Sequence, residues 1–171
     1  MAKIEQIIPF ILKWEGGYVH NKYDNGGATN KGVTYKTWED YCKRKGKEAS
    51  LTTLRNMTSK EWEDIFREHS WNPWQADKIA SQRVANICVD WSWMSGTTRV
   101  IKKVQKLLGV TADGIVGPKT LASINGHSED SLFGKIKELR KKFYYNIVKN
   151  NPEQNVFLRG WLNRLDDLSR L

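Results

Sequence analysis

Apolar residues recur every three or four positions through most of this chain, and that spacing is the period of an α-helix. The clearest case begins at Thr97 and ends at Gly109, a residue type that commonly follows a helix end. Its apolar stripe comprises Val100, Ile101, Val104, Leu107 and Leu108. The same pattern elsewhere in the chain predicts an all-α, or mainly α, fold.

Start and stop signals predict the other helices. We expect them over about 4–15, 36–45, 58–68, 81–96, 118–124, 128–149 and 152–171. Pro9 should kink the first helix or delay its start. Thr58 and Glu61 form a capping box at the start of the third. The helix that follows Ser81 is apolar around much of its girth, so we expect it to be the central buried helix.

No linker or low-complexity run separates these segments. We therefore expect a first region over residues 1–96 and a helical second region over residues 97–171, packed together as one compact body. Cys42 and Cys88 both fall in predicted helices. A chain of this length can build its hydrophobic core without disulfides, so we expect reduced thiols. No tract of twenty apolar residues occurs, so we expect no membrane span.

The helical period disappears between Gly16 and Thr34, where Gly, Asn and Asp dominate. This composition predicts a loop or a small irregular hairpin, the one place where we expect β structure. Glu15 and Asp24 lie nine residues apart around the glycines. Glycines let a bulky ligand approach the main chain, so the pattern indicates a shaped cleft. Two carboxylates across a cleft are typical of glycoside hydrolysis.

The balance of charge predicts an anionic partner. The sequence has 28 Lys and Arg residues against 19 Asp and Glu, which gives a net charge of +9. Nucleic acid is one candidate, but the basic residues are spread through the chain without a recognised nucleic-acid motif, so we expect no nucleic-acid partner. A bacterial cell wall would attract the same charge. The rings of the eight Trp and six Tyr suit sugars as well as bases, so they fit a glycan partner.

Several motifs in one order resemble glycoside hydrolase family 108, the lysozyme-like muramidases of bacteria and their phages. They are EGGY, DNGGATNKGVT, WNPWQAD and VDWSWMSG. The later stretch KKVQKLLGVTADGIVGPKTLASIN resembles the predicted peptidoglycan domain that follows the catalytic region in that family. The resemblance implies a lysozyme-like helical bundle with the small loop or hairpin at its active site. It also implies cleavage of the β-1,4 bond between N-acetylmuramic acid and N-acetylglucosamine in peptidoglycan.

The spacing from Glu15 to Asp24 and on to Thr29 also resembles the Glu, Asp and Thr set of phage-type lysozymes, which implies catalytic roles for these three residues. Glu15 would be the general acid, which must keep its proton near neutral pH and therefore needs partial desolvation. Asp24 would stabilise the transition state or, with Thr29, position the attacking water. Asp24 and Thr29 are also ordinary turn residues, so a structural role stays open for both. The family commonly has an asparagine where this chain has Met94, which puts a polar contact of relatives in doubt here.

Aromatic and polar residues near these acids are candidates for contact with the glycan. Tyr18, Trp71 and Trp74 could stack on sugar rings, although a Trp-Asn-Pro-Trp turn could equally plug one end of a helical bundle. His20 and Asn30 are the remaining candidates for substrate binding. We expect no metal site and no cofactor, because the three histidines lack Cys or His partners at ligand spacing.

Two rival functions share most of these features. A lytic transglycosylase would cut the same bond with one acid and no water, and a non-catalytic wall-binding protein would not need Glu15. No classical signal peptide is recognisable at the N-terminus. We therefore expect synthesis in the cytoplasm and action on the wall after release by a holin, by lysis or by dedicated export. A phage or prophage endolysin and a secretion-associated muramidase both fit, and a monomer is expected.

Overall fold

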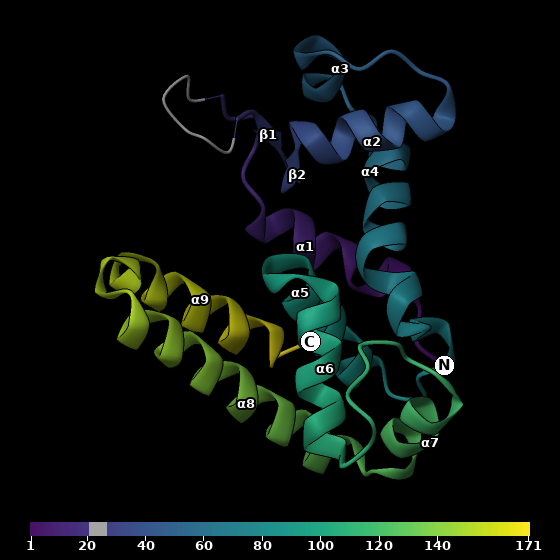
Figure 1. The fold of residues 1–171 in the computed structure, drawn as a ribbon, viewed down its shortest axis with the longest axis vertical. Helices are drawn as coiled ribbons and strands as arrows, with labels where there is room; N and C mark the ends of the chain where they lie inside the picture. The colour runs from purple at the N-terminus through teal and green to yellow at the C-terminus, as the bar shows by residue number, and fades with distance from the viewer. Residues whose placement is uncertain (21–26) are drawn as a thin grey trace. The chain divides into compact units, whose positions relative to one another are not determined.

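Helices make up most of the chain in the computed structural model, which describes residues 1–20 and 27–171 (Figure 1). The prediction of a mainly α fold is confirmed. The chain forms two compact units, one of residues 8–68 and a larger one of residues 1–7 and 69–171. Each unit is described below by itself.

The smaller unit combines short helices with one β-hairpin. Its elements are α1 (Ile8–Trp14), β1 (Thr29–Asn30), β2 (Val33–Thr34), α2 (Tyr35–Lys45), α3 (Leu51–Arg55) and α4 (Ser59–Phe66). The predicted hairpin is confirmed, and so is the capping box of Thr58 and Glu61. Pro9 delays the first helix, because a short 3₁₀ turn, η1 (Ile4–Gln6), precedes it and Pro9 lies in the first turn of α1.

The helix α3 was not predicted from the sequence. It is five residues long and buries only Leu54, so it has no apolar stripe. Its start is fixed by a capping box. The backbone N–H of Thr53 donates to the Ser50 hydroxyl, and the hydroxyl of Thr53, in place of the usual Glu or Gln side chain, accepts from the backbone N–H of Ser50. Both signals used to find helices were therefore missing here.

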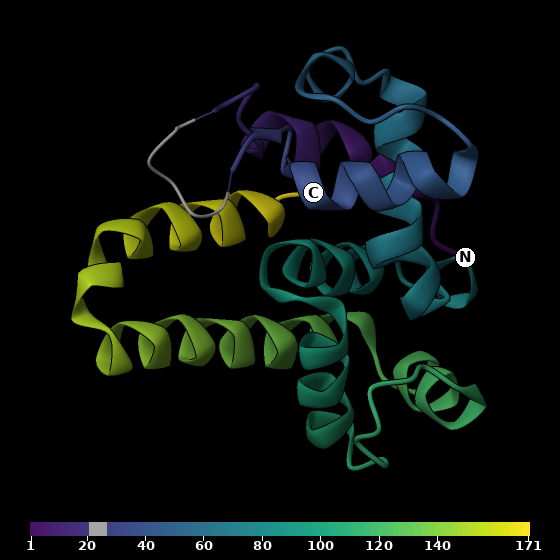
Figure 2. The same ribbon diagram turned by 45° about the horizontal axis from the view of Figure 1, so that its top comes forward.

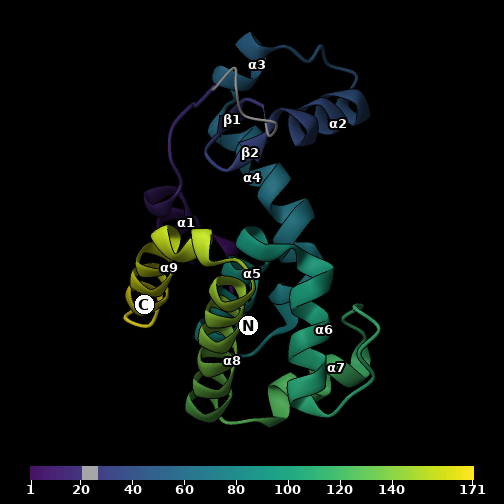
Figure 3. The ribbon, with the colours of Figure 1, turned by 60° about the vertical axis from the view of Figure 1, so that its left-hand side comes forward.

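The larger unit contains the long helices. Beyond residues 1–7, it begins with three short turns, η2 (Arg67–Trp71), which starts at the end of the smaller unit, η3 (Asn72–Trp74) and η4 (Ala76–Lys78). They are followed by α5 (Gln82–Ser95), α6 (Thr97–Leu108), α7 (Pro118–Gly126), α8 (Glu129–Asn150), η5 (Pro152–Gln154) and α9 (Asn155–Leu168). The helix α9 turns back alongside α8 (Figure 2), and both α6 and α8 pack against α5 (Figure 3). None of the described helices is long and apolar enough to cross a membrane.

The helix α5 is the buried centre of the larger unit, as the sequence predicts. Ser81 caps it by accepting a hydrogen bond from the backbone N–H of Val84. Every residue from Val84 to Ser92 is buried. Cys88, in the middle of this run, is a free thiol whose pKa is raised by burial.

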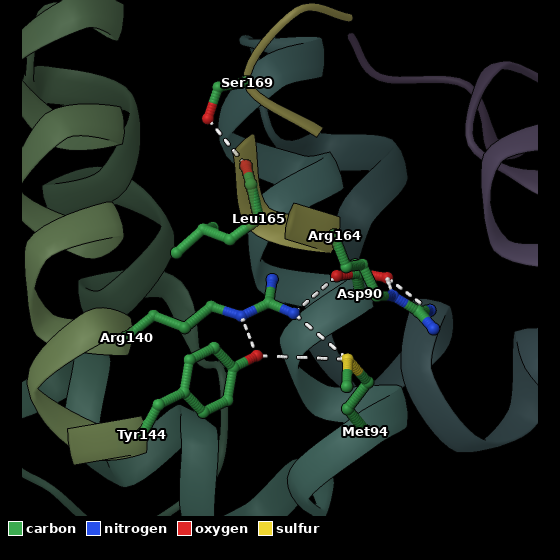
Figure 4. A network of polar contacts seen from close by, with 7 residues as sticks. All are labelled: Asp90, Met94, Arg140, Tyr144, Arg164, Leu165 and Ser169. Atoms are coloured by element: carbon green, nitrogen blue, oxygen red, sulfur yellow. Dashed lines mark hydrogen bonds and ion pairs between the residues drawn. The ribbon is translucent and has the colours of Figure 1, made fainter. Parts of the chain in front are cut away.

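A buried carboxylate on α5 joins this helix to α8 and α9 (Figure 4). Asp90 has no exposed surface and accepts hydrogen bonds from Arg140 at 2.7 Å and from Arg164 at 2.7 Å and 2.9 Å. Arg140 also donates to the hydroxyl of Tyr144 at 2.6 Å and lies 3.3 Å from the sulfur of Met94. Asp90 is therefore a structural residue.

The second half of α8 buries polar side chains. The apolar residues Leu139, Phe143 and Ile147 are partly exposed, whereas Arg140 and Tyr144 are buried. An apolar stripe cannot reveal this arrangement, because the buried face here carries a guanidinium group that meets Asp90. The predicted regional boundary at residue 96 falls inside the larger unit, at the turn between α5 and α6.

The substitution Asp90→Asn should destabilise the larger unit by about 3–5 kcal/mol, because it leaves two buried guanidinium groups without their anion. Urea unfolding followed by tryptophan fluorescence measures the change. Asp166→Asn is the matched control, since Asp166 is half exposed and pairs with Lys137 at 3.1 Å. The control should cost less than about 1 kcal/mol. Equal costs would contradict a structural role for the Asp90 network.

The capping box of α4 should make the smaller unit sensitive to acid. Burial alone would raise the pKa of Glu61, but hydrogen bonds from Lys47 at 2.6 Å and from Thr58 at 2.9 Å outweigh it and lower that pKa below its ordinary value of 4.5. A lowered pKa means that the carboxylate stabilises the folded state above pH 4.5 and loses this effect as the pH falls through the lowered value.

We therefore expect Glu61→Gln to lower the free energy of unfolding by about 1 kcal/mol at pH 7. The difference from the wild type should shrink below pH 4.5. Urea unfolding at several pH values tests this. Glu39→Gln makes the same charge change at an exposed position of α2 and should show no such dependence. A difference that is the same at pH 7 and at acid pH would refute the assignment.

Candidate functional site

The β-hairpin of the smaller unit is built on a tight two-residue turn. Lys31 and Gly32 both have positive φ angles, 48° and 79°, as in the turns that match the twist of paired strands. Thr29 pairs with Thr34 and Asn30 pairs with Val33. A third segment joins this sheet, because Val19 and Thr29 exchange two backbone hydrogen bonds of 2.8 Å.

Side-chain hydrogen bonds anchor the hairpin to α3 and α4. The amide of Asn30 is buried and donates to the carbonyl oxygens of Leu54 at 2.8 Å and Arg55 at 3.2 Å. The indole N–H of Trp62, on α4, donates to the carbonyl oxygen of Lys31 at 2.9 Å. Both bonds go to backbone oxygens, so they fix the path of the main chain. We therefore place Asn30 among the residues that hold the hairpin rather than among those that meet substrate.

Glu15 lies directly after the last residue of α1, as the sequence predicts. Its backbone N–H donates to the carbonyl oxygen of Ile11 at 3.0 Å, which continues the helical bonding by one residue, and the residue is half-buried. Gly16 and Gly17 follow and are exposed, and a Cβ atom at either position would meet no neighbour within 4 Å. The backbone beside Glu15 is therefore open to a ligand.

The bridge between Val19 and Thr29 ties the segment after Glu15 to the hairpin. Thr29 is partly buried on β1, and its partner Val19 stands four residues beyond Glu15. The bridge therefore places the segment after Glu15 beside β1. Asp24 itself lies outside the described residues.

Tyr18 is half-buried, and the guanidinium group of Arg55 lies over its ring, 5.7 Å from the ring centroid. A cation at this distance is attracted to the electron-rich face of the ring. The sequence did not point to Arg55, because α3 was not predicted and nothing else links residue 55 to residue 18. His20 is exposed.

Trp71 and Trp74 are fully buried in the larger unit. The indole N–H of Trp71 donates to Asp77 at 2.9 Å, and that of Trp74 donates to Ser92 at 2.7 Å. Burial leaves no face of either ring open to a sugar. The structure therefore replaces the predicted stacking role with the alternative in which the Trp-Asn-Pro-Trp turn fills the core.

Metal binding has no support in the part of the chain that the structure describes. Across residues 1–20 and 27–171, no three His, Cys, Asp or Glu side chains gather closely enough to hold an ion. The chemistry that this site offers is that of a half-buried carboxyl group beside an open, glycine-lined backbone.

Comparisons with known proteins show what this chain is similar to. The model of the Glycosyl hydrolase 108 family matches residues 8–96, and the model of the Predicted Peptidoglycan domain matches residues 99–166. The solved structure of Brucella abortus SagA aligns with a TM-score of 0.80 at 30% sequence identity, over 97% of this chain and 91% of that chain. A search of curated proteins finds no match.

The anchoring of the hairpin predicts the effect of Asn30→Ala. The substitution removes a buried donor from two carbonyl oxygens, which should cost about 1–3 kcal/mol. Hydrogen exchange of the backbone amides of Val19 and Thr29 should become faster, because the bridge loses its support. Lys36→Ala, at an exposed position just after the hairpin, is the control and should leave both amides protected. Unchanged exchange in Asn30→Ala would show that the strands hold together without this anchor.

Proposed function

We propose that this chain, which belongs to the glycosyl hydrolase 108 family, cleaves the β-1,4 bond between N-acetylmuramic acid and N-acetylglucosamine with Glu15 as general acid. The chain is a glycoside hydrolase that acts on peptidoglycan, since the family match is followed by a peptidoglycan-domain match. The bond and the acid are what the proposal adds. The observation that carries it is the position of Glu15, half-buried at the end of α1 and next to two open glycines.

A general acid suits this position. The leaving sugar oxygen departs poorly unless it is protonated, so the acid must hold a proton until the bond breaks. Glu15 follows the half-buried Trp14, whose ring lies 6.4 Å from that of Phe10 on the same helix. The end of α1 that precedes the acid is therefore aromatic.

Asp24 and Thr29 complete the proposed machinery. Asp24 would carry the negative charge that stabilises an oxocarbenium-like transition state, or would activate the attacking water. Thr29 stands on β1 with its backbone fixed by Val19, so its hydroxyl starts from a rigid support. Tyr18, backed by Arg55 on one face, is the proposed contact for a sugar ring, and His20 is a second proposed contact.

The proposed setting follows from the substrate. Peptidoglycan lies outside the cytoplasm, so the enzyme would reach it after release by a holin, by lysis or by dedicated export. Both a phage or prophage endolysin and a secretion-associated muramidase would act in this way, as monomers that enter an insoluble mesh. The net charge of +9 would favour adsorption to an anionic wall.

Glu15→Gln should lower the rate of peptidoglycan digestion by at least about a hundredfold, because a carboxamide cannot donate the proton. Purified peptidoglycan is digested with the wild type and the variant, and the soluble products are weighed by mass spectrometry. Reducing muramic acid ends that disappear with the variant are the expected result. Glu5→Gln, at an exposed position of η1, is the control and should digest at the wild-type rate.

The same products separate the alternatives. Ends with a 1,6-anhydro ring would reassign the chain as a lytic transglycosylase. Full activity in Glu15→Gln would remove Glu15 from the proposal. Unfolding of each variant in urea is measured in parallel, so that a loss of activity is not mistaken for a loss of fold.

A further inference from the structure

A pocket of about 460 Å³ lies in the larger unit, where the chain passes from α6 into α7. It is far along the sequence from Glu15, and nothing in the proposed cleavage uses it. Its walls are Val110, Thr111, Asp113, Ile115, Gly117, Pro118, Lys119 and Thr120. These residues all fall inside the match to the Predicted Peptidoglycan domain. Its volume is in the range that small-ligand sites occupy.

Gln105, a buried residue of α6, fixes the shape of the pocket through its side-chain hydrogen bonds. Its amide nitrogen donates to Asp113 at 2.8 Å, to the carbonyl oxygen of Ile115 at 2.9 Å and to the hydroxyl of Thr120 at 3.2 Å. Its amide oxygen accepts from the backbone N–H of Gly114 at 2.9 Å. One side chain thus ties the loop to the first turn of α7.

Two further contacts hold the loop against its surroundings. Gly114 has a φ angle of 86°, and a Cβ atom there would come within 2.8 Å of the Thr98 side chain. The loop therefore lies directly on α6. The side-chain amide of Gln75 donates to the carbonyl oxygen of Val116, which attaches the loop to the segment before α5. The walls are preformed, so a ligand would not have to order them.

The chemistry of the walls favours a peptide over a sugar. Val110, Ile115 and Pro118 provide aliphatic surface, and Ile115 is 70% exposed at the pocket. None of the lining residues, which all lie in the described range 110–120, is aromatic. Sugar rings are held mainly by aromatic faces, whereas small alkyl side chains pack on aliphatic ones.

The charge around the pocket favours an anion. Lys119 lines it and is exposed. Among these lining residues, all of them described, its ammonium group is the one positive charge, and the carboxylate of Asp113 is the one negative charge. The acidic residue, Asp113, already accepts hydrogen bonds from Gln105 and from the backbone N–H of Ile115, which lower its pKa. Asp113 therefore stays ionised on these partners, and the ammonium group of Lys119 is left to meet a ligand anion.

We propose that this pocket binds the peptide stem of peptidoglycan. A short alkyl side chain of the stem would pack on Val110, Ile115 and Pro118, and a free carboxylate would pair with Lys119. The inference rests on the proposed function, because it takes peptidoglycan as the substrate. It adds a second contact with the wall, which recognises peptide rather than glycan and lies outside the catalytic machinery.

The test is a titration of the full chain, carrying Glu15→Gln, observed by nuclear magnetic resonance of its backbone amides. The first probe is a synthetic stem tetrapeptide that ends in D-alanine with a free carboxylate. The second is the same peptide with a C-terminal amide. The third is a peptide-free oligomer of N-acetylglucosamine and N-acetylmuramic acid. The tetrapeptide should shift the amides of residues 110–120, and the amidated peptide should bind more weakly.

Lys119→Glu should weaken binding of the free acid roughly three- to tenfold, since it replaces attraction by repulsion at an exposed site. Lys106→Glu makes the same charge change at an exposed position of α6 away from the pocket, and it should change the affinity less than about twofold. Both positions are exposed, so neither variant should disturb the fold.

Three results would overturn the assignment. They are peptide shifts that map away from residues 110–120, equal losses in Lys119→Glu and Lys106→Glu, and shifts of residues 110–120 by the peptide-free glycan alone. The outcome is separate from that of the cleavage assay, because the titration uses a variant without the catalytic carboxyl group. Loss of digestion in Glu15→Gln without binding of the stem peptide would support Glu15 as the general acid and contradict stem binding by the pocket. Binding of the stem peptide with unchanged digestion in Glu15→Gln would support the pocket and contradict the role of Glu15.

Discussion

The ion pairs of Asp90 are the interaction on which the larger unit depends. A carboxylate in a protein interior costs free energy unless it is paired, and here Arg140 and Arg164 both donate to it. Asp90 lies within the segment that matches the hydrolase family, whereas both arginines lie within the peptidoglycan-domain match. The two segments therefore share one buried network in this unit. The second segment is therefore not an independently packed module.

The smaller unit secures its candidate site by other means. The path of the hairpin is fixed by hydrogen bonds that Asn30 and Trp62 donate to backbone oxygens. The bridge of Val19 and Thr29 then connects the hairpin to the segment that follows Glu15. A rigid support of this kind leaves side chains such as Tyr18 and the open glycines available for a ligand.

Much of the fold could be predicted because local signals are strong in this sequence. Ser81 and Gly109 mark helix ends by the geometry of their own backbone and side chain, and the structure places both as expected. Burial was harder to predict. Arg140 is buried only because Asp90, fifty residues earlier, lies opposite it. Trp71 and Trp74 have rings that suit either a sugar or a core, so their burial could not be read from the sequence. The position of Glu15 followed from the predicted helix α1. The hydrogen bond that anchors Asn30 goes to α3, a helix that was not predicted.

The separation of Asp90 from its partners also sets an order for folding during synthesis. Arg140 follows Asp90 by 50 positions and Arg164 follows it by 74. While the ribosome is still making α6 and α7, the carboxylate of α5 has no guanidinium group to meet, so its buried ion pairs cannot form. The smaller unit, whose residues are complete at Glu68, has no such delay. The hairpin and the end of α1 beside Glu15 should therefore fold first. The ion pairs of Asp90 should form last, once α9 has left the ribosome.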